Sequence, residues 1–316
     1  FKAGNSKGNK IGQLKRGVDM RVAVTGGTGF IGRYLLRELL GQGYEVNAWF
    51  RHEESRTGIL EHPKLHWVKG CLEDAGSMPL LLENCDAVVH NALWRPGNTF
   101  RGTEGDLAKY TQINLVGSLS LMEIAAKRQV DRFVYVSTCA VHEKIMDDRP
   151  LDETHPLWPF SHYGAHKAAV EKFVHSFAFG HQFPVCAIRP SGVYGVSHRI
   201  SASKYYDLIG AIARGEDVEC KRGGKEVHAA DVARGILYLI AAPRDAILGE
   251  AFNCYDRYVS EIEVARIARD LSGSRSNITG VEKSPKHEID TTKLRRLGMN
   301  FGGEEQLRKT VKDLLE

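Results

Sequence analysis

The sequence predicts a protein of the α/β class, with a doubly wound parallel sheet and a smaller C-terminal α/β lobe. Over the first 190 residues, short apolar runs alternate with longer amphipathic stretches. Strands that are apolar throughout are typical of a parallel sheet covered by helices on both faces. A glycine-rich turn joins the first apolar run to the first amphipathic stretch, which is the strand–turn–helix order of such folds.

Six strands and four helices are expected before Pro190. The strands are predicted at residues 21–25, 45–50, 65–69, 87–90, 133–137 and 185–189. The helices are predicted at residues 31–40, 78–83, 107–128 and 163–179. Right-handed crossovers between parallel strands then give a doubly wound sheet. After Pro190 the order loosens, and helices are expected near residues 202–214, 231–241 and 261–271, among short strands.

Composition limits the kinds of partner. The 316 residues are 42% hydrophobic and 26% charged, as in ordinary globular proteins. No apolar run approaches the ~20 residues that span a bilayer, and no cleavable signal is found. We therefore expect no membrane partner and a cytoplasmic location. The six cysteines are scattered without a Cys-x-x-Cys pair, so no metal site is expected.

The first nineteen residues differ in charge from the rest of the chain. Residues 1–19 carry five cations and one acid, and this excess equals the net charge of +4 of the whole chain. We expect a leader or flexible arm, although a basic tail can also serve an anionic partner. The remainder from Met20 onward is neutral, which gives no electrostatic reason to expect a nucleic acid partner.

The turn after the first predicted strand has the features of a phosphate-binding loop. Gly26, Gly29 and Gly32 follow one another at the spacing GxxGxxG. Glycine permits a tight turn and lets backbone N–H groups approach a pyrophosphate at a helix N-terminus. Three glycines alone also fit a structural turn, but the strand before and the helix after favour a dinucleotide site. Residues 20–190 are therefore expected to be a Rossmann-type NAD(P)-binding domain with the catalytic residues, and residues 191–316 mainly a substrate-binding lobe.

Tyr163 and Lys167 form a candidate acid/base pair. They lie four residues apart on a predicted helix, so their side chains share one face. A free tyrosine titrates near ~10, and lowering this pKa by ~3 units requires about 4 kcal/mol in favour of the phenolate. One cation at ~4 Å and an effective dielectric constant of ~20 supplies about that much. The alternative is a half-buried tyrosine beside a solvated lysine.

The chain resembles a known enzyme superfamily along nearly all of its length after Met20. The matching stretches are Thr25–Gly32, His90-Asn91-Ala92, Asn114, Ser137-Thr138, Tyr163-x-x-x-Lys167, Arg189-Pro190, Val193-Tyr194-Gly195 and Val227–Ala233. In combination they resemble the extended short-chain dehydrogenase/reductase superfamily and its NAD-dependent epimerase/dehydratase group. The resemblance implies an NAD(P)-dependent oxidoreductase or epimerase that transfers hydride at a secondary alcohol or ketone carbon of a small molecule, including a sugar or sugar nucleotide. It also implies a homodimer formed through the helices at 107–128 and 163–179.

Two other functions stay open at this point. One is an NADPH-dependent reductase of a small ketone or aldehyde. The other is a dinucleotide-binding sensor or scaffold without turnover. The presence of both Tyr163 and Lys167 argues against the sensor, because a protein that only binds the dinucleotide needs the glycines and Lys167 alone.

The resemblance also assigns roles to single residues. Tyr163 would transfer the proton, Lys167 would lower the pKa of Tyr163 and hold the nicotinamide ribose, and Thr138 would orient the substrate oxygen. Asn114 would hold backbone and water near the site, although a plain helix asparagine is equally consistent with the sequence. The residues expected to bind the cofactor are Gly26, Thr28, Gly29, Phe30, Ile31, Gly32, Arg51, Leu72, Asn91, Ala92, Lys167, Pro190 and Val193.

The end of the second predicted strand favours NADP over NAD. Arg51 and His52 stand where an acid would bind the ribose 2′-hydroxyl of NAD, and a cation there can accommodate the 2′-phosphate of NADP. Arg33 is a further cation near this position. The alternative is a solvated arginine at a strand end. Cys71 replaces an aspartate that often contacts adenine in the family, which leaves adenine to backbone groups and Leu72.

The substrate side departs from the family pattern at several positions. Cys139 and Ala140 replace the Asp-Glu pair that eliminates water in sugar-nucleotide dehydratases, which argues against a 4,6-dehydratase. Gly192 replaces an asparagine that grips the substrate diphosphate, and no arginine stands at the matching place before Val227. The candidates for substrate contact are Trp94, Arg95, Cys139 and Tyr194. Arg95 could pair with an anionic substrate or be solvated. His142 could contact substrate, although a surface histidine is the expectation. Asp231 is expected to cap a helix.

Overall fold

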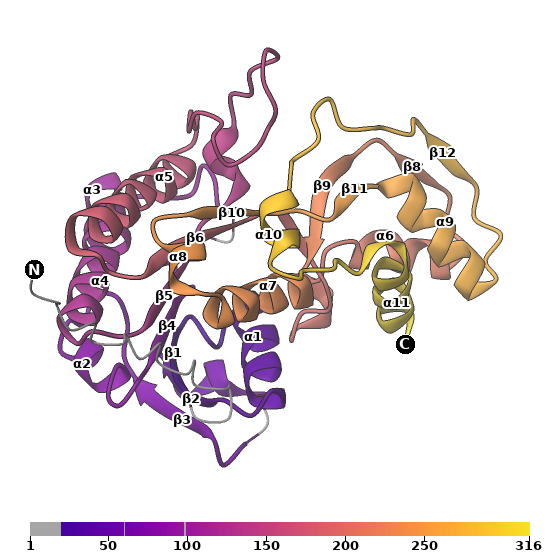
Figure 1. Cartoon of the computed structure of the whole chain (residues 1–316). Coiled ribbons are helices and arrows are strands. Elements are labelled where there is room, and N and C mark those ends of the chain that lie inside the picture. Colours follow the sequence, from indigo (N-terminus) through magenta and orange to yellow (C-terminus); the bar gives the residue numbers. More distant parts are fainter. Residues whose placement is uncertain (1–19, 60, 98) are drawn as a thin grey trace, which may run out of the picture.

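The computed structural model describes residues 20–59, 61–97 and 99–316 (Figure 1). The leader expected at residues 1–19 lies outside this part of the chain. Within it, seven parallel strands form the main sheet in the order β10-β6-β5-β4-β1-β2-β3. The strands are β1 (Arg21–Thr25), β2 (Glu45–Phe50), β3 (Leu65–Lys69), β4 (Ala87–His90), β5 (Arg132–Val136), β6 (Val185–Pro190) and β10 (Ala251–Cys254). The predicted doubly wound parallel sheet is confirmed.

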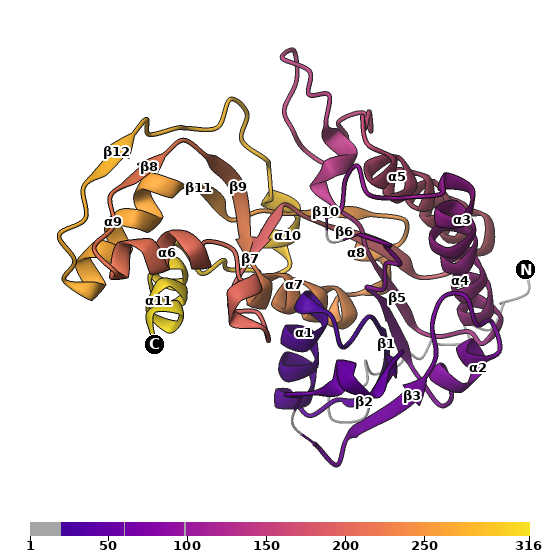
Figure 2. The ribbon, with the colours of Figure 1, turned by 180° about the vertical axis from the view of Figure 1, so that it is seen from behind.

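Helices cover both faces of this sheet. On one face lie α1 (Phe30–Gly41) and α7 (Ala229–Ala241), side by side in Figures 1 and 2. On the other lie α2 (Ser77–Leu81), α4 (Gly117–Lys127) and α5 (His162–His175). Successive strand residues point to opposite faces, so Val22 and Val24 pack in the first hydrophobic layer and Ala23 in the second. Both layers are apolar, which is why the strands read as uninterrupted apolar runs.

Two of the long predicted helices are interrupted by π-helical turns. The stretch predicted at 107–128 consists of α3 (Leu107–Thr111), a π-helical turn (Gln112–Val116) and α4. The stretch predicted at 163–179 consists of α5 and a second π-helical turn (Ser176–Gly180). Such turns are rare and occur frequently at functional sites. The first one contains Asn114.

The C-terminal lobe has its own core. β7 (Gly192–Tyr194), β9 (Gly223–His228) and β11 (Arg257–Ser260) form one small sheet, and β8 (Val218–Cys220) and β12 (Ile278–Gly280) form another. They pack with α6 (Tyr206–Ala213), α9 (Glu261–Ser272) and α11 (Gly303–Leu315) (Figure 2). The sequence did not predict α11. The short elements are α8 (Arg244–Ile247), α10 (Thr292–Arg296) and the 3₁₀ turns Glu53–Arg56, Cys139–His142 and Ile200–Ala202.

The chain returns to the first sheet after residue 190. Both α7 and β10 follow that residue in the sequence, yet α7 covers the main sheet and β10 extends it beside β6.

The N-cap of α7 differs from the expectation for Asp231. His228 is the N-cap and its Nδ1 accepts the N–H of Ala230 at 3.2 Å, whereas Asp231 lies in the first turn and accepts the N–H of Gly302 at 3.1 Å. In the part of the chain described here, no helix has the length and apolar character required to cross a bilayer.

Candidate active site

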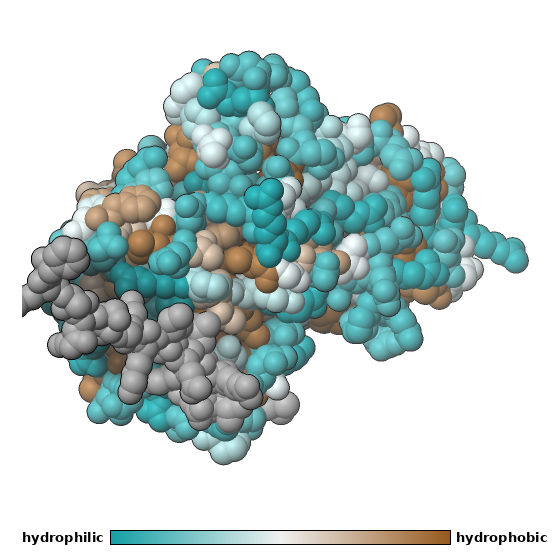
Figure 3. Space-filling model, viewed as in Figure 1, coloured by the Kyte–Doolittle hydropathy of each residue, from teal (hydrophilic) through white to brown (hydrophobic). Residues whose placement is uncertain are grey.

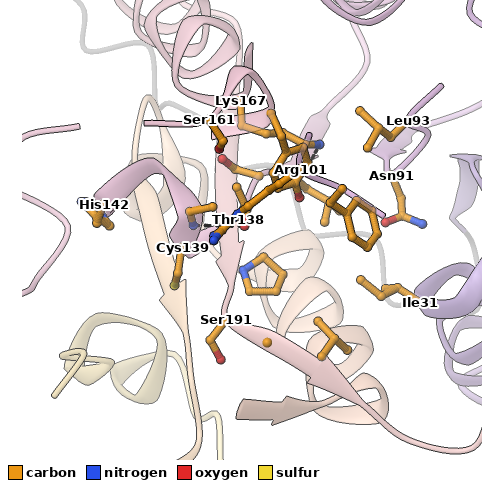
Figure 4. Close-up of a pocket in the computed structure, with 18 of the residues that line it drawn as sticks. Ile31, Asn91, Leu93, Arg101, Thr138, Cys139, His142, Ser161, Lys167 and Ser191 are labelled. Atoms are coloured by element: carbon orange, nitrogen blue, oxygen red, sulfur yellow. Dashed lines mark hydrogen bonds between the residues drawn. The ribbon is translucent and has the colours of Figure 1, made fainter. Parts of the chain in front are cut away.

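A cavity of about 1290 Å³ lies at the carboxyl ends of β1, β4, β5 and β6, between the sheet and the C-terminal lobe (Figure 4). Its walls bring together the glycine turn, the segment after β4, the end of β5 and the first turns of α5. Ligands of doubly wound proteins bind in this crevice, outside the carboxyl ends of the strands. Most of the site residues predicted from the sequence line this cavity.

The glycine turn is shaped so that only glycine fits at two positions. Gly26 has φ +69°, and a Cβ atom there would lie 2.9 Å from the backbone nitrogen of Ala92. A Cβ atom on Gly32 would lie 2.1 Å from the carbonyl oxygen of Gly26. Within the described residues, α1 begins after Gly29 without a capping side chain, so the N–H groups of its first turn are available to a ligand. This cradle fits a dinucleotide pyrophosphate.

A buried hydrogen-bond network ties the glycine turn to β4. Thr25 Oγ1 lies 2.8 Å from Nδ1 of His90, and Nε2 of His90 lies 2.7 Å from the hydroxyl of Ser118. Thr25 Oγ1 also accepts the N–H groups of Asn91 and Ala92, each at 3.0 Å. Burial lowers the pKa of His90 to about 3, so this ring is neutral. The network fixes Asn91 and Ala92 against the turn, and both line the cavity.

The catalytic candidates meet between β5 and α5. Thr138 follows β5, and Ser161 starts α5 as its N-cap, accepting the N–H of Gly164 at 3.0 Å. Tyr163 is the second residue of α5, and its hydroxyl interacts with the side chain of Thr138, which lowers the pKa of the phenol. The ammonium of Lys167 donates to the carbonyl oxygen of Val136 at 2.7 Å. Thr138, Tyr163 and Lys167 all line the cavity, and Figure 4 draws Thr138 and Lys167 near its centre.

The pKa values of this pair differ from the expectation. Burial raises the pKa of Tyr163, opposed by the hydrogen bond to Thr138 and the cation of Arg101. Burial also lowers the pKa of Lys167 to about 7, opposed by Glu171. In this structure the groups that oppose the effect of burial on Tyr163 are Thr138 and Arg101, and the predicted effect of Lys167 on the pKa of Tyr163 stays a prediction.

Comparisons with known proteins agree with this geometry. A sequence model of the NAD dependent epimerase/dehydratase family matches residues 22–254. The chain belongs to this family. A ketoreductase of Stigmatella aurantiaca, named for 4-hydroxy-2-methyl-3-oxo-4-farnesyl-3,4-dihydroquinoline-1-oxide, is 32% identical over 234 residues, which are 71% of this chain. The match covers 65% of that relative, so the chain spans just under two thirds of its length.

Solved structures of the epimerase/dehydratase family have the same fold. A dTDP-glucose 4,6-dehydratase from Streptomyces venezuelae, with NAD bound, is 25% identical and has a TM-score of 0.74. The superposition covers 93% of this chain and 96% of that one. A UDP-N-acetylglucosamine 4-epimerase from Methanobrevibacter ruminantium is 23% identical and has a TM-score of 0.78, over 93% of this chain and 97% of its own. The predicted Rossmann-type fold and family are thus confirmed.

Most of the cofactor residues expected from the family resemblance line the cavity, and three do not. The lining residues of this set are Gly26, Thr28, Gly29, Phe30, Ile31, Asn91, Ala92, Lys167, Pro190 and Val193. Gly32 is buried beneath the turn, and Leu72 is buried against Gly117. Arg51 lies outside the cavity and pairs with Glu73 at 3.0 Å, with half of its side chain exposed.

Two substrate candidates do not reach the cavity. Tyr194 is buried in the core of the C-terminal lobe, where its ring packs edge-on against His228. The Trp94 ring packs toward Tyr110, and the amide of Asn114 binds the backbone of Trp94, accepting its N–H at 2.7 Å and donating to its carbonyl at 2.9 Å. These positions correct the expectation that Tyr194 and Trp94 contact substrate. Asn114 is fully buried outside the cavity lining, and it holds the backbone of the segment that follows β4, as the resemblance implied.

The other two substrate candidates, Arg95 and Cys139, do line the cavity. The Cys139 thiol donates to the carbonyl oxygen of Arg189 at 3.0 Å, and burial raises its pKa to about 12, so it is not a thiolate nucleophile. The guanidinium of Arg95 lies 4.6 Å from the centre of the Phe100 ring. Arg95 is thus engaged with a neighbouring side chain of the cavity wall.

A buried ion pair behind the catalytic strand end was not predicted. Arg189 on β6 donates to Glu171 on α5 at 2.6 Å, and Glu171 also accepts a hydrogen bond from the hydroxyl of Ser137. Arg189 lies 3.2 Å from Nε2 of His142. His142 is buried, not at the surface as expected, and burial lowers its pKa to about 3. The sequence gives no signal for this pairing, because the partners come from different elements.

Position 192, where the family resemblance implies an asparagine, lies against an acid. A Cβ atom on Gly192 would lie 2.7 Å from Oε2 of Glu226, and one on Gly224 would lie 2.4 Å from its Oε1. Glu226 is buried and forms an ion pair with Lys204. A side chain at position 192 would therefore require the carboxylate of Glu226 to move. Among the described residues, no group of three or more metal-ligating side chains is found.

Proposed function

We propose that this chain is an NADP-preferring oxidoreductase that acts at a secondary alcohol or ketone carbon of a small molecule. The observation that carries the proposal is that Thr138, Tyr163 and Lys167 line one cavity together with the glycine turn. When bound, the dinucleotide would supply or accept the hydride. Tyr163 would move the proton to or from the substrate oxygen, and Thr138 would hold that oxygen.

Lys167 would hold the nicotinamide ribose. Its ammonium donates to only one carbonyl oxygen among the hydrogen bonds of the described residues, and an ammonium has three donors. Lys167 lines the same cavity as Tyr163. Two ribose hydroxyls are suitable acceptors for the remaining N–H groups.

NADP is favoured because the end of β2 carries cations and not an acid. Arg51 follows β2 directly, and its pair with Glu73 is exposed and therefore weak. Arg33 donates to the carbonyl oxygens of Thr28 at 3.0 Å and Ser55 at 2.7 Å, which places a second guanidinium between the glycine turn and the segment after β2. Fluorescence titration with NADPH and NADH tests this point. We expect tighter NADPH binding that R51A weakens about 10-fold, and a clear NADH preference would overturn it.

The substrate is proposed to be a ketone, aldehyde or alcohol without a nucleoside diphosphate. Gly192 offers no side-chain amide to hold a diphosphate, and the carboxylate of Glu226 packs beside it. Cys139 and Ala140 also lack the acid pair of the dehydratases. The second candidate is a sugar-nucleotide epimerase, favoured by the structural likeness to the archaeal UDP-N-acetylglucosamine 4-epimerase.

The central experiment combines a substrate screen with Y163F. Thermal shift in the presence of NADP would compare nucleotide sugars with small ketones and aldehydes. With a substrate from this screen, Y163F should lose turnover by about 10²- to 10⁴-fold and keep NADPH affinity within about 2-fold. The control is Y238F, because Tyr238 lies on α7 outside the cavity. Unchanged turnover in Y163F would end the proposed mechanism, and tight NADPH binding without turnover of any compound would favour the sensor.

Two further points belong to this proposal. We expect a homodimer, since large hydrophobic side chains are exposed along the α3–α4 and α5 stretches at Leu107, Val116 and Phe173. A hydrophobic patch is visible in Figure 3 where α5 lies. Light scattering coupled to size-exclusion chromatography measures the mass of the protein in solution and so tests the dimer.

A cytoplasmic location is supported by the six free cysteines, because reducing compartments keep thiols unpaired.

A further inference from the structure

A short segment lies against the catalytic tyrosine. Residues 99–105, here called the cover segment, contribute Thr99, Phe100 and Arg101 to the cavity wall. The ring of Phe100 lies 5.4 Å from the ring of Tyr163, at an interplanar angle of 42°. The guanidinium carbon of Arg95 lies 4.6 Å from the centre of the same Phe100 ring. The cover segment therefore packs on Tyr163 through an aromatic contact.

The cover segment is tied to the protein by Glu143. Nε of Arg101 lies 3.1 Å from Oε1 of Glu143. Only 11% of the Glu143 side chain is exposed, and its carboxylate also accepts the N–H groups of Phe160 and Ser161, the latter at 2.7 Å, and the hydroxyl of Ser161 at 3.0 Å. Although burial opposes it, these hydrogen bonds lower the pKa of Glu143, so the group is a carboxylate at neutral pH.

Glu143 thereby connects three parts of the site. It follows the 3₁₀ turn that begins directly after Thr138. Through Ser161 it holds the N-cap of α5, and Tyr163 is the second residue of that helix. Through Arg101 it holds the cover segment. The orientation of the first turn of α5 relative to Thr138 depends on this one carboxylate, because the N-cap sets where a helix begins.

We propose that Glu143 and Arg101 are positioning residues of the active site: their ion pair closes the cover segment over Tyr163, and Glu143 holds the first turn of α5 so that Tyr163 stays against Thr138. The inference rests on the proposed role of Tyr163. No cofactor contact is needed for it, since all the partners belong to the chain.

The two residues differ in how firmly they are held. Arg101 has 59% of its side chain exposed, and exposed ion pairs are weak, so the cover segment can open to admit a substrate and close again. Glu143 keeps its backbone hydrogen bonds when this pair opens. Arg101 also acts on Tyr163 directly, because its positive charge lowers the pKa of the phenol against the effect of burial.

Hydrogen–deuterium exchange of the full chain tests the positioning role. In E143Q we expect amide exchange at residues 160–164 to rise by about 10-fold, as for the loss of a helix N-cap. In R101M we expect faster exchange in the cover segment and a change below about 2-fold at residues 160–164. The matched control is R149Q, because Arg149 forms an exposed pair with Asp148 outside the cavity wall. Unchanged exchange at 160–164 in E143Q would overturn the role of Glu143.

A second measurement separates positioning from mere stability. NMR of tyrosine labelled with ¹³C at Cζ follows the titration of Tyr163, whose signal is assigned from Y163F. In R101M the midpoint should rise relative to R149Q, because a cation that favours the phenolate is lost, and R101K should restore part of the shift. Equal midpoints in R101M and R149Q would overturn the role of Arg101. Neither readout requires turnover, so failure here is distinct from failure of Y163F to lose activity.

Discussion

Replacing Glu171 by glutamine should destabilise the protein strongly, because it leaves the Arg189 guanidinium buried without a counter-ion. Only 4% of the Arg189 side chain and 3% of the Glu171 side chain are exposed. Arg189 donates to this carboxylate at 2.6, 3.0 and 3.1 Å. Removing one partner of such a buried pair costs about 3–5 kcal/mol of unfolding free energy. At ~2 °C per kcal/mol for a large domain, the melting temperature should fall by roughly 6–10 °C.

Thermal unfolding followed by circular dichroism measures this effect. R149Q removes an exposed pair and should change the unfolding free energy by less than about 0.5 kcal/mol. In the double variant E171Q/R189M much of the loss should be recovered, since the uncompensated charge is gone. A melting temperature of E171Q within about 2 °C of the native protein, or a double variant less stable than E171Q, would refute the assignment of a buried ion pair.

Three further predictions concern residues in and beneath the cavity wall. G32A should abolish NADPH binding in a fluorescence titration, because its Cβ atom would lie 2.1 Å from the carbonyl oxygen of Gly26, and retained affinity would contradict the geometry of the turn. Since burial lowers the pKa of Lys167 from 10.5 to about 7, the unfolded chain binds more protons between these pH values. The unfolding free energy should therefore rise from pH 7 to 10.5 in the native protein and less in K167M, and parallel denaturant curves would count against it. Burial raises the pKa of Cys139 to about 12, so iodoacetamide at pH 8 should leave this thiol unmodified in mass spectra of the folded protein.

The sequence predicted the elements that have a strong local pattern. β1, β2, β3 and β4 begin and end where the apolar runs do. β10 (Ala251–Cys254) was missed because a buried asparagine interrupts its short apolar run. Its place in the sheet depends on pairing with β6, which no local pattern specifies. The π-helical turns were missed for a similar reason, since a π turn and an α turn share the same residue types.

The sequence predicted the site residues that lie close together in the chain, and it missed or misplaced those whose surroundings depend on the fold. Tyr163 and Lys167 lie one helical turn apart, so spacing alone places them on one face. Tyr194 was misplaced because it neighbours Val193, and adjacent residues of a strand point to opposite sides. Val193 lines the cavity, so Tyr194 packs into the lobe core. Glu143 gave no signal, because its partners lie in two loops that only the fold brings together.

The protonation state of Tyr163 bears on the proposed proton transfer. Burial raises the pKa of Tyr163, and the cation of Arg101 and the hydrogen bond to Thr138 do not reverse it. At neutral pH the phenol therefore carries its proton. Reduction of a ketone needs a proton donor beside the substrate oxygen as hydride reaches the carbon, whereas oxidation of an alcohol needs a base there. A neutral phenol next to Thr138 is in the form that proton donation to a substrate oxygen requires, and the reverse reaction would return the proton to the same oxygen.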